Sequence, residues 1–429
     1  QIAAEELDIH PDRCHIINAD TGQTSNEGYT AGSNSVEGSG SAIRQAAAEA
    51  RRYLLNMAAQ NWNVSPDSLT VDNGMIMANS GEEISYWKLL EGKFIEERIT
   101  GEAKPKSPKD YKYVGEPLKR GDIEKMVKAE SHFVQDLQMP GMVHARVVHP
   151  PSYENKLQSI NLSEVEAMPG VLKVIRNGSF LAVVAVREYQ AIKAWEKLKS
   201  LAVWETISIE TLQADLHKSM KQTPGKPQDV EVSPGIEKVL ANSEVQHEAE
   251  YFRPYLMHAS VGPSCSLAFW EEDQLTIWSP TQGVYPARGT LADLFSIKEE
   301  NIRCIGLPGS GCYGHNGADD VTAEAALIAK EMPGKQVRLQ WMREDENKWE
   351  PYGSSMAFRL SGGVDSSGKL LAWDSIIWSD SHSSRPNGRA GSFISARHLE
   401  SAFEFNKGGF SGGSYRNGIP EYVYPYSCT

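Results

Sequence analysis

The sequence predicts a multidomain α+β protein, and three observations lead to that prediction. Its 429 residues are enough for two or three domains, each with its own core. Short apolar runs of strand length alternate with stretches of helical periodicity along most of the chain. A content of 40% hydrophobic and 23% charged residues is typical of ordinary globular proteins. We therefore expect several compact domains in which helices and strands are mixed.

The N-terminal region is predicted to hold a helix, a strand, a polar loop, a long helix and a hairpin. Residues 1–8 fit the end of a helix and residues 13–19 a strand. After a loop rich in Gly, Ser and Thr, apolar residues recur at helical spacing over residues 43–58. Asp72-Asn73-Gly74 stands between two apolar runs, which indicates a β-hairpin over residues 69–78.

Two further α+β regions are predicted beyond a connector rich in Lys and Pro at residues 104–119. The first is expected to contain strands and helices at residues 142–148, 162–167, 171–175, 180–186 and 189–198. A helix at residues 209–220 and a Pro- and Gly-rich stretch lead to the second. It is expected to contain elements at residues 267–270, 275–278, 302–307, 321–330, 336–342, 356–360 and 370–378.

The most informative stretch is residues 302–317, IRCIGLPGSGCYGHNG. A strand breaks at Pro308 into a loop, and a helix follows the loop. The glycines of this loop are Gly309, Gly311, Gly314 and Gly317. Because glycine has no Cβ and accepts positive φ, such a backbone can approach a ligand closely and offer it N–H groups. We expect a compact, electron-rich ligand.

The residues alone leave three interpretations of this loop open. Residues 309–314 formally fit G-x-G-x-x-G, the dinucleotide fingerprint of an NAD-dependent dehydrogenase. Asp319 and Asp320 open the next helix, however, and two carboxylates there would repel a pyrophosphate. The loop also fits an ordinary glycine-rich turn between strand and helix. The third interpretation is a loop for another cofactor, and it depends on the rest of the chain.

A second candidate loop precedes the long N-terminal helix. It is centred on residues 28–35, GYTAGSNS, and its hydroxyl and N–H groups could receive an anion at the helix N-terminus. The four residues assigned to this role are Gly32, Ser33, Asn34 and Ser35. A solvated loop with a Ser cap explains the same residues equally well.

Composition excludes several other functions. A net charge of −13 and a pI near 5.4 argue against nucleic acid as the main partner. The longest apolar run, residues 180–186, is too short to span a bilayer. The five cysteines include no C-x-x-C and the eleven histidines no H-x-x-x-H, so a metal or cluster ligated by this chain has little support. Since the chain starts with Gln inside a helical pattern, we expect it to be a piece of a longer protein.

Several motifs resemble the molybdenum hydroxylases, the family of xanthine dehydrogenase and aldehyde oxidase. The motifs that resemble its hammerhead domain are residues 141–151, 168–171 and 180–185. Those that resemble its first molybdopterin-binding domain are residues 258–263, 279–282, the glycine loop and 343–346. Residues 28–35 and the helix after them resemble part of its second such domain.

Residues 28–35 and the helix after them stand ahead of the hammerhead motifs. This order is similar to that in the permuted large subunits of isoquinoline 1-oxidoreductase and nicotinate dehydrogenase type. Residues 311–317 and 349–353 look closest to the latter. The resemblance implies part of the second molybdopterin-binding domain at residues 1–103 and a hammerhead α/β domain at 121–205. A linker at 206–244 and a truncated first molybdopterin-binding domain at 245–429 would follow.

The resemblance implies a molybdopterin cofactor, in the cytosine dinucleotide form usual in bacteria, whose pterin and not the protein holds the molybdenum. Gln282 would be an amide donor toward an oxygen ligand of the metal, and Tyr313-Gly314 stand where the family has Phe-Gly. The cofactor-binding residues implied in this part of the chain are Gln282, Gly309, Gly311, Cys312, Tyr313 and Gly314.

The implied reaction is hydroxylation of an N-heteroaromatic compound or an aldehyde, with water as the source of oxygen. The electrons would leave through a 2Fe-2S small subunit, toward a cytochrome or another acceptor. The base of the family is a glutamate expected outside this chain, so the chain alone is expected not to turn over substrate. The compartment stays open between the cytoplasm and the periplasm of a bacterium.

The sequence departs from the family pattern at several positions. Ser310 stands where Gly is common, Gly262 where many members have Glu, and His149 where Arg is common. His315 and Asn316 replace the Gly-Lys of xanthine dehydrogenases, so a purine substrate is not expected.

Two competing functions differ in class from this enzyme. One is a non-catalytic scaffold that only binds the cofactor. The other is a serine hydrolase, because residues 409–413 fit G-x-S-x-G, although the residues that follow cannot form the helix that this motif requires.

Overall fold

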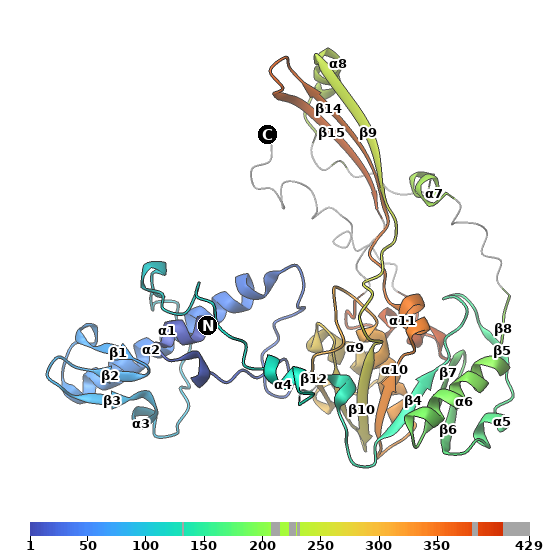
Figure 1. The fold of residues 1–429 in the computed structure, drawn as a ribbon, viewed down its shortest axis with the longest axis horizontal. Coiled ribbons are helices and arrows are strands. Elements are labelled where there is room, and N and C mark those ends of the chain that lie inside the picture. Colours follow the sequence, from blue (N-terminus) through green and yellow to red (C-terminus); the bar gives the residue numbers. More distant parts are fainter. Residues whose placement is uncertain (131–132, 207–214, 223–228, 230–231, 380–384, 406–429) are drawn as a thin grey trace. The chain divides into compact units, whose positions relative to one another are not determined.

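The computed structural model describes residues 1–130, 133–206, 215–222, 229, 232–379 and 385–405 (Figure 1). The G-x-S-x-G stretch and Cys428 lie outside the described residues. The chain divides into two compact units, which are described separately below. Unit 1 comprises Gln1–Ala19 and Gln23–Ser131, and unit 2 comprises Asp20–Gly22 and His132–Thr429. Both units combine helices with sheets, so the predicted α+β class is confirmed.

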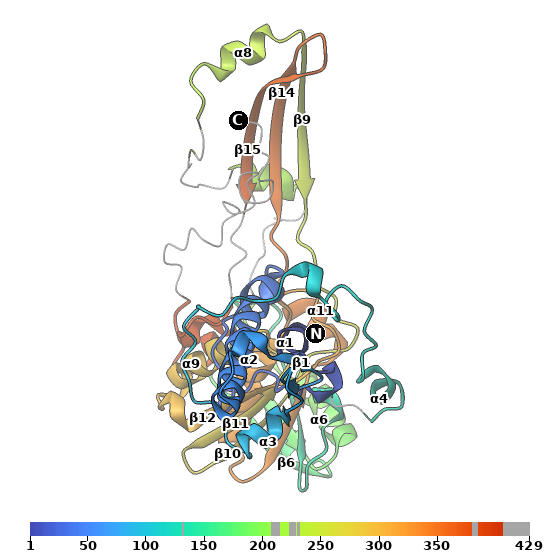
Figure 2. The same cartoon turned by 90° about the vertical axis from the view of Figure 1, so that its left-hand side faces the viewer.

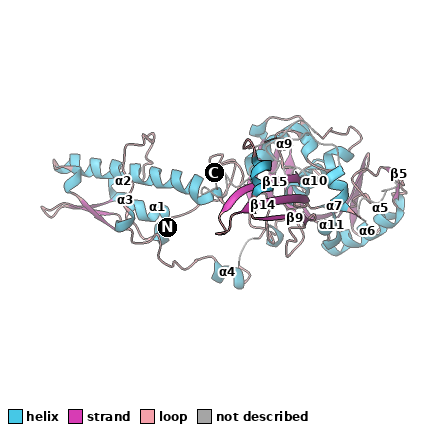
Figure 3. Cartoon of the chain, turned by 90° about the horizontal axis from the view of Figure 1, so that it is seen from above, coloured by secondary structure: helices cyan, strands magenta, loops and turns pink. Residues whose placement is uncertain are grey.

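Unit 1 is built around the long helix α2 (Ser41–Trp62), which packs on a small antiparallel sheet (Figure 3). The sheet contains β1 (Thr70–Asp72), β2 (Met75–Met77) and β3 (Glu83–Ser85) in that order. The shorter helices are α1 (Ile2–Leu7), α3 (Tyr86–Leu90) and α4 (Ile123–Val127). Leu54, Leu55 and Ala58 of α2 meet Val71 and Ile76 in the core, because the helix turns its apolar stripe to the sheet.

In unit 1 the predicted hairpin is confirmed, whereas the predicted strand at residues 13–19 is wrong. β1 and β2 form the predicted hairpin, and its turn has φ of 45° at Asn73 and 78° at Gly74, as this type of turn requires. Residues 14–19, all of them described, form no strand. Ile16 and Ile17 are 77% and 51% exposed, so their β propensity finds no neighbouring strand or core to pack against.

Unit 2 contains a seven-stranded sheet in the order β12-β11-β10-β13-β4-β7-β6 (Figure 1). Its strands are β4 (Val143–Val147), β6 (Val171–Asn177), β7 (Phe180–Ala185), β10 (Cys265–Glu271), β11 (Gln274–Ser279), β12 (Ile302–Gly306) and β13 (Gln336–Gln340). The pairs β11–β12 and β13–β4 are parallel, and the other neighbours are antiparallel. Strands of the two predicted C-terminal regions therefore share one sheet, while the predicted domain boundaries stay a prediction.

Helices cover both faces of this sheet. The covering helices are α6 (Glu188–Leu201), α9 (Val284–Phe295) and α10 (Ala318–Lys330). Along β7, Phe180, Ala182 and Val184 belong to the core under α9 and α10, whereas Leu181 and Val183 belong to the core under α6. Burial on both faces explains why this strand is a continuous apolar run.

The remaining elements of unit 2 are smaller. Helices α5 (Ser163–Glu166) and α11 (Arg343–Trp349) and the strand pair β5 (Leu157–Ser159) and β8 (Val203–Trp204) flank the main sheet. A separate antiparallel sheet holds β9 (Val245–Arg253), β14 (Met356–Val364) and β15 (Leu370–Ser379), with α7 (Leu216–Gln222) and α8 (Ile236–Asn242) beside it (Figure 2). No helix among the described residues has both the length and the apolar character needed to cross a membrane.

Candidate functional site

The glycine loop and the turn that holds Gln282 leave the main sheet at the same edge. β11 and β12 are parallel neighbours, and Ser279 at the end of β11 lies opposite Gly306 at the end of β12. A Cβ added to Gly309 would lie 2.7 Å from the Cβ of Pro280, so the two segments touch where both leave the sheet. The structure thus brings the turn of Gln282 beside the loop, because carboxyl ends of parallel strands share one edge.

The backbone of the loop takes conformations that side chains oppose. The φ angles are 119° at Gly311, 53° at Tyr313 and 133° at Gly314. A Cβ on Gly314 would lie 2.4 Å from the imidazole of His258, and a Cβ on Gly311 would lie 2.9 Å from the ring of Tyr313. Only glycine fits these two positions, and the Tyr313 side chain stands 64% exposed.

The loop also presents backbone donors. Within the described part of the chain, no hydrogen bond uses the N–H group of Gly311, Cys312, Tyr313 or Gly314 as its donor. The Cys312 thiol donates to the Gly314 carbonyl at 3.0 Å, which folds the loop on itself. A row of such N–H groups on a backbone without obstructing Cβ atoms fits the oxygen-rich face of a cofactor. The residues present therefore fit the predicted molybdopterin.

The helix that follows the loop begins with two buried carboxylates. Asp319 accepts a hydrogen bond from the Thr281 hydroxyl at 2.5 Å and lies 3.1 Å from His315. Asp320 accepts one from the Ile394 N–H group at 2.8 Å. Two acidic side chains already occupy this end of α10 and accept hydrogen bonds there, an arrangement that opposes a pyrophosphate and hence the dinucleotide interpretation.

The four predicted residues of the second loop belong to unit 1, whereas Gln282 and the glycine loop belong to unit 2. Gly32 and Ser33 have φ of 63° and 59°, and all four residues are exposed. A π-helical turn (Val36–Gly40) joins this loop to α2, which begins at Ser41, two residues before the predicted apolar pattern at 43–58.

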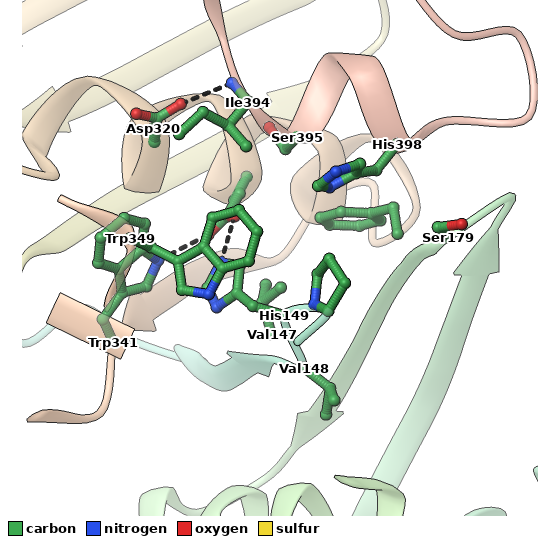
Figure 4. Close-up of a pocket in the computed structure, with 13 residues that line it drawn as sticks. Val147, Val148, His149, Ser179, Asp320, Trp341, Trp349, Ile394, Ser395 and His398 are labelled. Carbon is green, nitrogen blue, oxygen red and sulfur yellow. Dashed lines mark hydrogen bonds and ion pairs between the residues drawn. The ribbon is translucent and has the colours of Figure 1, made fainter. Parts of the chain in front are cut away.

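A buried charge cluster lies at the end of β4 (Figure 4). The imidazole of His149 is 7% exposed and bonds Glu324 of α10 at 2.7 Å and Asp345 of α11 at 3.0 Å. The rings of Trp341 and Trp349 lie 5.2 Å and 5.1 Å from it. Burial lowers the pKa of His149, but the charge of Glu324 and the bonds to both carboxylates outweigh burial and raise the pKa to about 10. A protonated His149 thus supplies positive charge where the family that the sequence resembles commonly has Arg.

The sequence alone did not indicate Glu324 or Asp345 as members of this cluster. Glu324 also accepts a hydrogen bond from the Trp341 indole at 2.7 Å, and Asp345 accepts one from the Met342 N–H group at 3.0 Å. The only available signal was the unusual His149 itself, since a buried histidine requires polar partners. Among the described residues, no group of three His, Cys, Asp or Glu side chains is placed to hold a metal ion.

Asp320, another buried ionisable group, lines a small cavity beside this cluster (Figure 4). Burial raises its pKa to about 7 from an ordinary value of 3.8, and the charge of Glu324 adds to the effect. Since the folded pKa is the higher one, ionisation opposes folding; this cost is absent below about pH 4 and complete above about pH 7.

Replacing Asp320 by Asn is therefore expected to stabilise the protein at alkaline pH. The Asn carbonyl can still accept the Ile394 N–H bond, and it carries no charge that burial would penalise. We expect a gain of about 1–3 kcal/mol in unfolding free energy at pH 8 and no gain at pH 4, measured by urea denaturation. A gain of equal size at both pH values would contradict the assignment of the raised pKa to Asp320.

Two parts of the chain match models of one kind of domain. A family model described as molybdopterin cofactor-binding domain matches residues 220–416, and a second model with the same description matches residues 1–128. These matches contain both candidate loops.

Two relatives of known name agree with these matches. The chain is 35% identical to a nicotinate dehydrogenase component of Pseudomonas putida over 383 residues, which are 87% of this chain and 32% of the relative. It is 23% identical to the beta component of isoquinoline 1-oxidoreductase of Brevundimonas diminuta over 435 residues, 89% of this chain and 55% of the relative. The solved structure of quinoline 2-oxidoreductase from Pseudomonas putida 86 has a TM-score of 0.49 at 16% identity, over 61% of this chain and 38% of that chain.

The chain thus spans about a third to about half the length of the two curated relatives. The predicted resemblance is confirmed at the level of the family. Because two molybdopterin cofactor-binding matches cover most of its length and named relatives extend over nearly all of it, this chain belongs to the molybdopterin-binding subunits of the molybdenum hydroxylase family.

Proposed function

We propose that this chain forms the molybdopterin-binding part of an oxidoreductase that hydroxylates an N-heteroaromatic compound or an aldehyde, with water as the source of oxygen. The observation that carries the proposal is the glycine loop, whose N–H groups at residues 311–314 have no protein acceptor within the described chain. Similarity to components of nicotinate dehydrogenase and isoquinoline 1-oxidoreductase supports the substrate class.

The residues of this chain would bind and orient the cofactor. When bound, molybdopterin supplies two-electron redox chemistry that amino-acid side chains lack. The N–H groups of residues 311–314 and the amide of Gln282 would donate hydrogen bonds to it, and the close backbone packing at Gly309 and Gly314 would keep these donors fixed. Residues 32–35 would receive an anionic part of the cofactor at the start of the helical segment that leads into α2.

The same proposal covers the nucleotide form of the cofactor and the subunit that accepts its electrons. We propose the cytosine dinucleotide form of molybdopterin and a 2Fe-2S small subunit that accepts the electrons. Both relatives are named as single subunits of their enzymes, which supports a multi-subunit enzyme here. The catalytic base would be a glutamate outside this chain.

Elemental analysis and acid release of the bound nucleotide test the proposal directly. The purified chain is expected to carry about one molybdenum and about one cytidine nucleotide per molecule, since one cofactor contributes both. Protein that binds NAD and no molybdenum would contradict the proposal. Protein that carries the cofactor but stays inactive with its partner subunits would favour the non-catalytic scaffold.

A charge substitution tests the N-terminal loop. Gly32→Asp is expected to lower molybdenum content severalfold, because a carboxylate would repel the anionic cofactor. Gly32→Asn is the matched control: it has the same shape without the charge, Asn tolerates the φ of 63°, and no atom lies within 4 Å of the added Cβ. Equal molybdenum content in the Asp and Asn variants would show that the loop is merely solvated.

A further inference from the structure

Helix α11 directs three charged side chains at a single loop. Arg343, Glu346 and Glu350 are spaced i, i+3 and i+7, so they lie on one face of the helix and its end. All three bind residues 258–264, which precede β10. We call residues 258–264 the support loop.

Glu350 holds the first part of the support loop. One of its carboxylate oxygens accepts hydrogen bonds from the N–H groups of His258 at 2.5 Å and Ala259 at 3.2 Å. Glu350 is 0% exposed, and its other oxygen has no hydrogen-bond partner among the described residues. Ala259 has a φ of 54°, a conformation that a residue with Cβ keeps only when its surroundings hold it there.

The other two side chains hold the rest of the support loop. Arg343 donates to the carbonyl of Ser260 at 2.8 Å and to that of Val261. Glu346 accepts from the N–H group of Ser264 at 2.7 Å and from its hydroxyl at 3.1 Å. Charged side chains therefore fix backbone groups along most of the support loop.

The support loop in turn holds the start of the glycine loop. The Ser260 hydroxyl donates to the Gly311 carbonyl at 3.1 Å, and the Ser310 hydroxyl donates to the Gly262 carbonyl at 2.7 Å. Asn316 donates to both the Ser260 hydroxyl, at 2.8 Å, and the Gly311 carbonyl, at 3.0 Å. The glycine loop is thus tied at both ends to one short segment.

We propose that Glu350 is a positioning residue for the glycine loop. It acts through the N–H groups of His258 and Ala259, and the imidazole of His258 packs directly against Gly314. Without Glu350, two partly buried N–H groups lose their acceptor and the positive φ of Ala259 loses its support. The support loop would then shift, and the donors of residues 311–314 would lose their fixed geometry. The expected effect of this shift on cofactor binding rests on the proposed function.

The thiol of Cys312 provides a readout within the glycine loop that needs no cofactor. In the full chain without cofactor, Glu350→Ala is expected to speed alkylation of Cys312 by about tenfold or more, the effect of losing hydrogen bonds to a charged group. Peptide mass spectrometry follows each cysteine separately. Glu350→Gln should restore a rate near that of the wild type, because its amide oxygen can accept the same two bonds. Molybdopterin content is expected to fall in Glu350→Ala and to recover in Glu350→Gln.

Two internal controls separate positioning from general unfolding. Glu344 lies on the same helix but is exposed and paired with Lys199, so Glu344→Ala should leave the Cys312 rate unchanged. Cys14 in unit 1 and buried Cys304 in the core should react at wild-type rates in all variants. An unchanged Cys312 rate in Glu350→Ala, or an equal rise at Cys304, would overturn the proposal.

A milder variant keeps the proposal testable if Glu350→Ala does not fold. Ser260→Ala removes the bond between the support loop and the Gly311 carbonyl, and should also accelerate alkylation of Cys312. An unchanged rate in this variant would overturn the link between the two loops. Wild-type chain that fails to bind molybdopterin would contradict the proposed function, and the alkylation rates would still decide the role of Glu350.

Discussion

Replacing Gln282 by Ala is expected to slow turnover of the complete enzyme by about ten- to a thousandfold while the cofactor stays bound. Gln282 lies in the turn after β11, beside the place where the ring of Pro280 packs against Gly309. Under the proposed assignment, loss of one fixed donor would weaken stabilisation of the charge that develops in the transition state, whereas the N–H groups of residues 311–314 would still be available to the cofactor. Steady-state kinetics together with molybdenum analysis measure both effects.

Gln274→Ala is the matched control for this prediction. Gln274 begins the same strand at the opposite end and is exposed, so its truncation should change neither rate nor molybdenum content. A wild-type rate in Gln282→Ala would remove Gln282 from the site. Loss of molybdenum in that variant would instead assign Gln282 to cofactor retention.

Replacing His149 by Leu is expected to lower the free energy of unfolding by about 3–5 kcal/mol at pH 7, the usual cost of breaking a buried ion pair. The variant leaves the buried carboxylates of Glu324 and Asp345 without the cation that bridges them at 2.7 Å and 3.0 Å. Denaturant unfolding at equilibrium measures the change. His144→Leu, on the strand β4 that ends just before His149, is the control, because burial lowers the pKa of His144 and favours its neutral form.

The pH dependence of His149 gives a second test. The pKa of His149 in the folded protein, about 10, lies above the ordinary value of 6.5. Its contribution to the free energy of unfolding is therefore complete below about pH 6.5 and is lost as pH rises toward 10. The stability difference between wild type and His149→Leu should therefore shrink between pH 7 and pH 10. A difference that stays constant over this range would show that His149 is neutral in the folded protein.

Local patterns account for the parts of the fold that could be predicted. The apolar spacing over residues 43–58 predicted helix α2, and Asp72-Asn73-Gly74 predicted the hairpin, since both depend only on neighbouring residues. The predicted strand at residues 13–19 was wrong, because a strand also needs a partner strand, and no local pattern reveals whether one is present. The roles of Gln282 and of the two candidate loops in cofactor binding stay predictions.

By itself, the sequence determined the α+β class, most of the individual elements and, through ordered motifs, the family of this chain. Only the tertiary structure decided that residues 143–185 and 265–340 share one sheet, and that α11 supports the glycine loop through residues 258–264. It also decided the partners of His149, which are 175 and 196 residues away along the chain. Backbone propensity and turn chemistry act between neighbours, whereas the choice of a buried partner depends on how distant segments pack, because each buried charge needs a compensating group wherever the fold provides one.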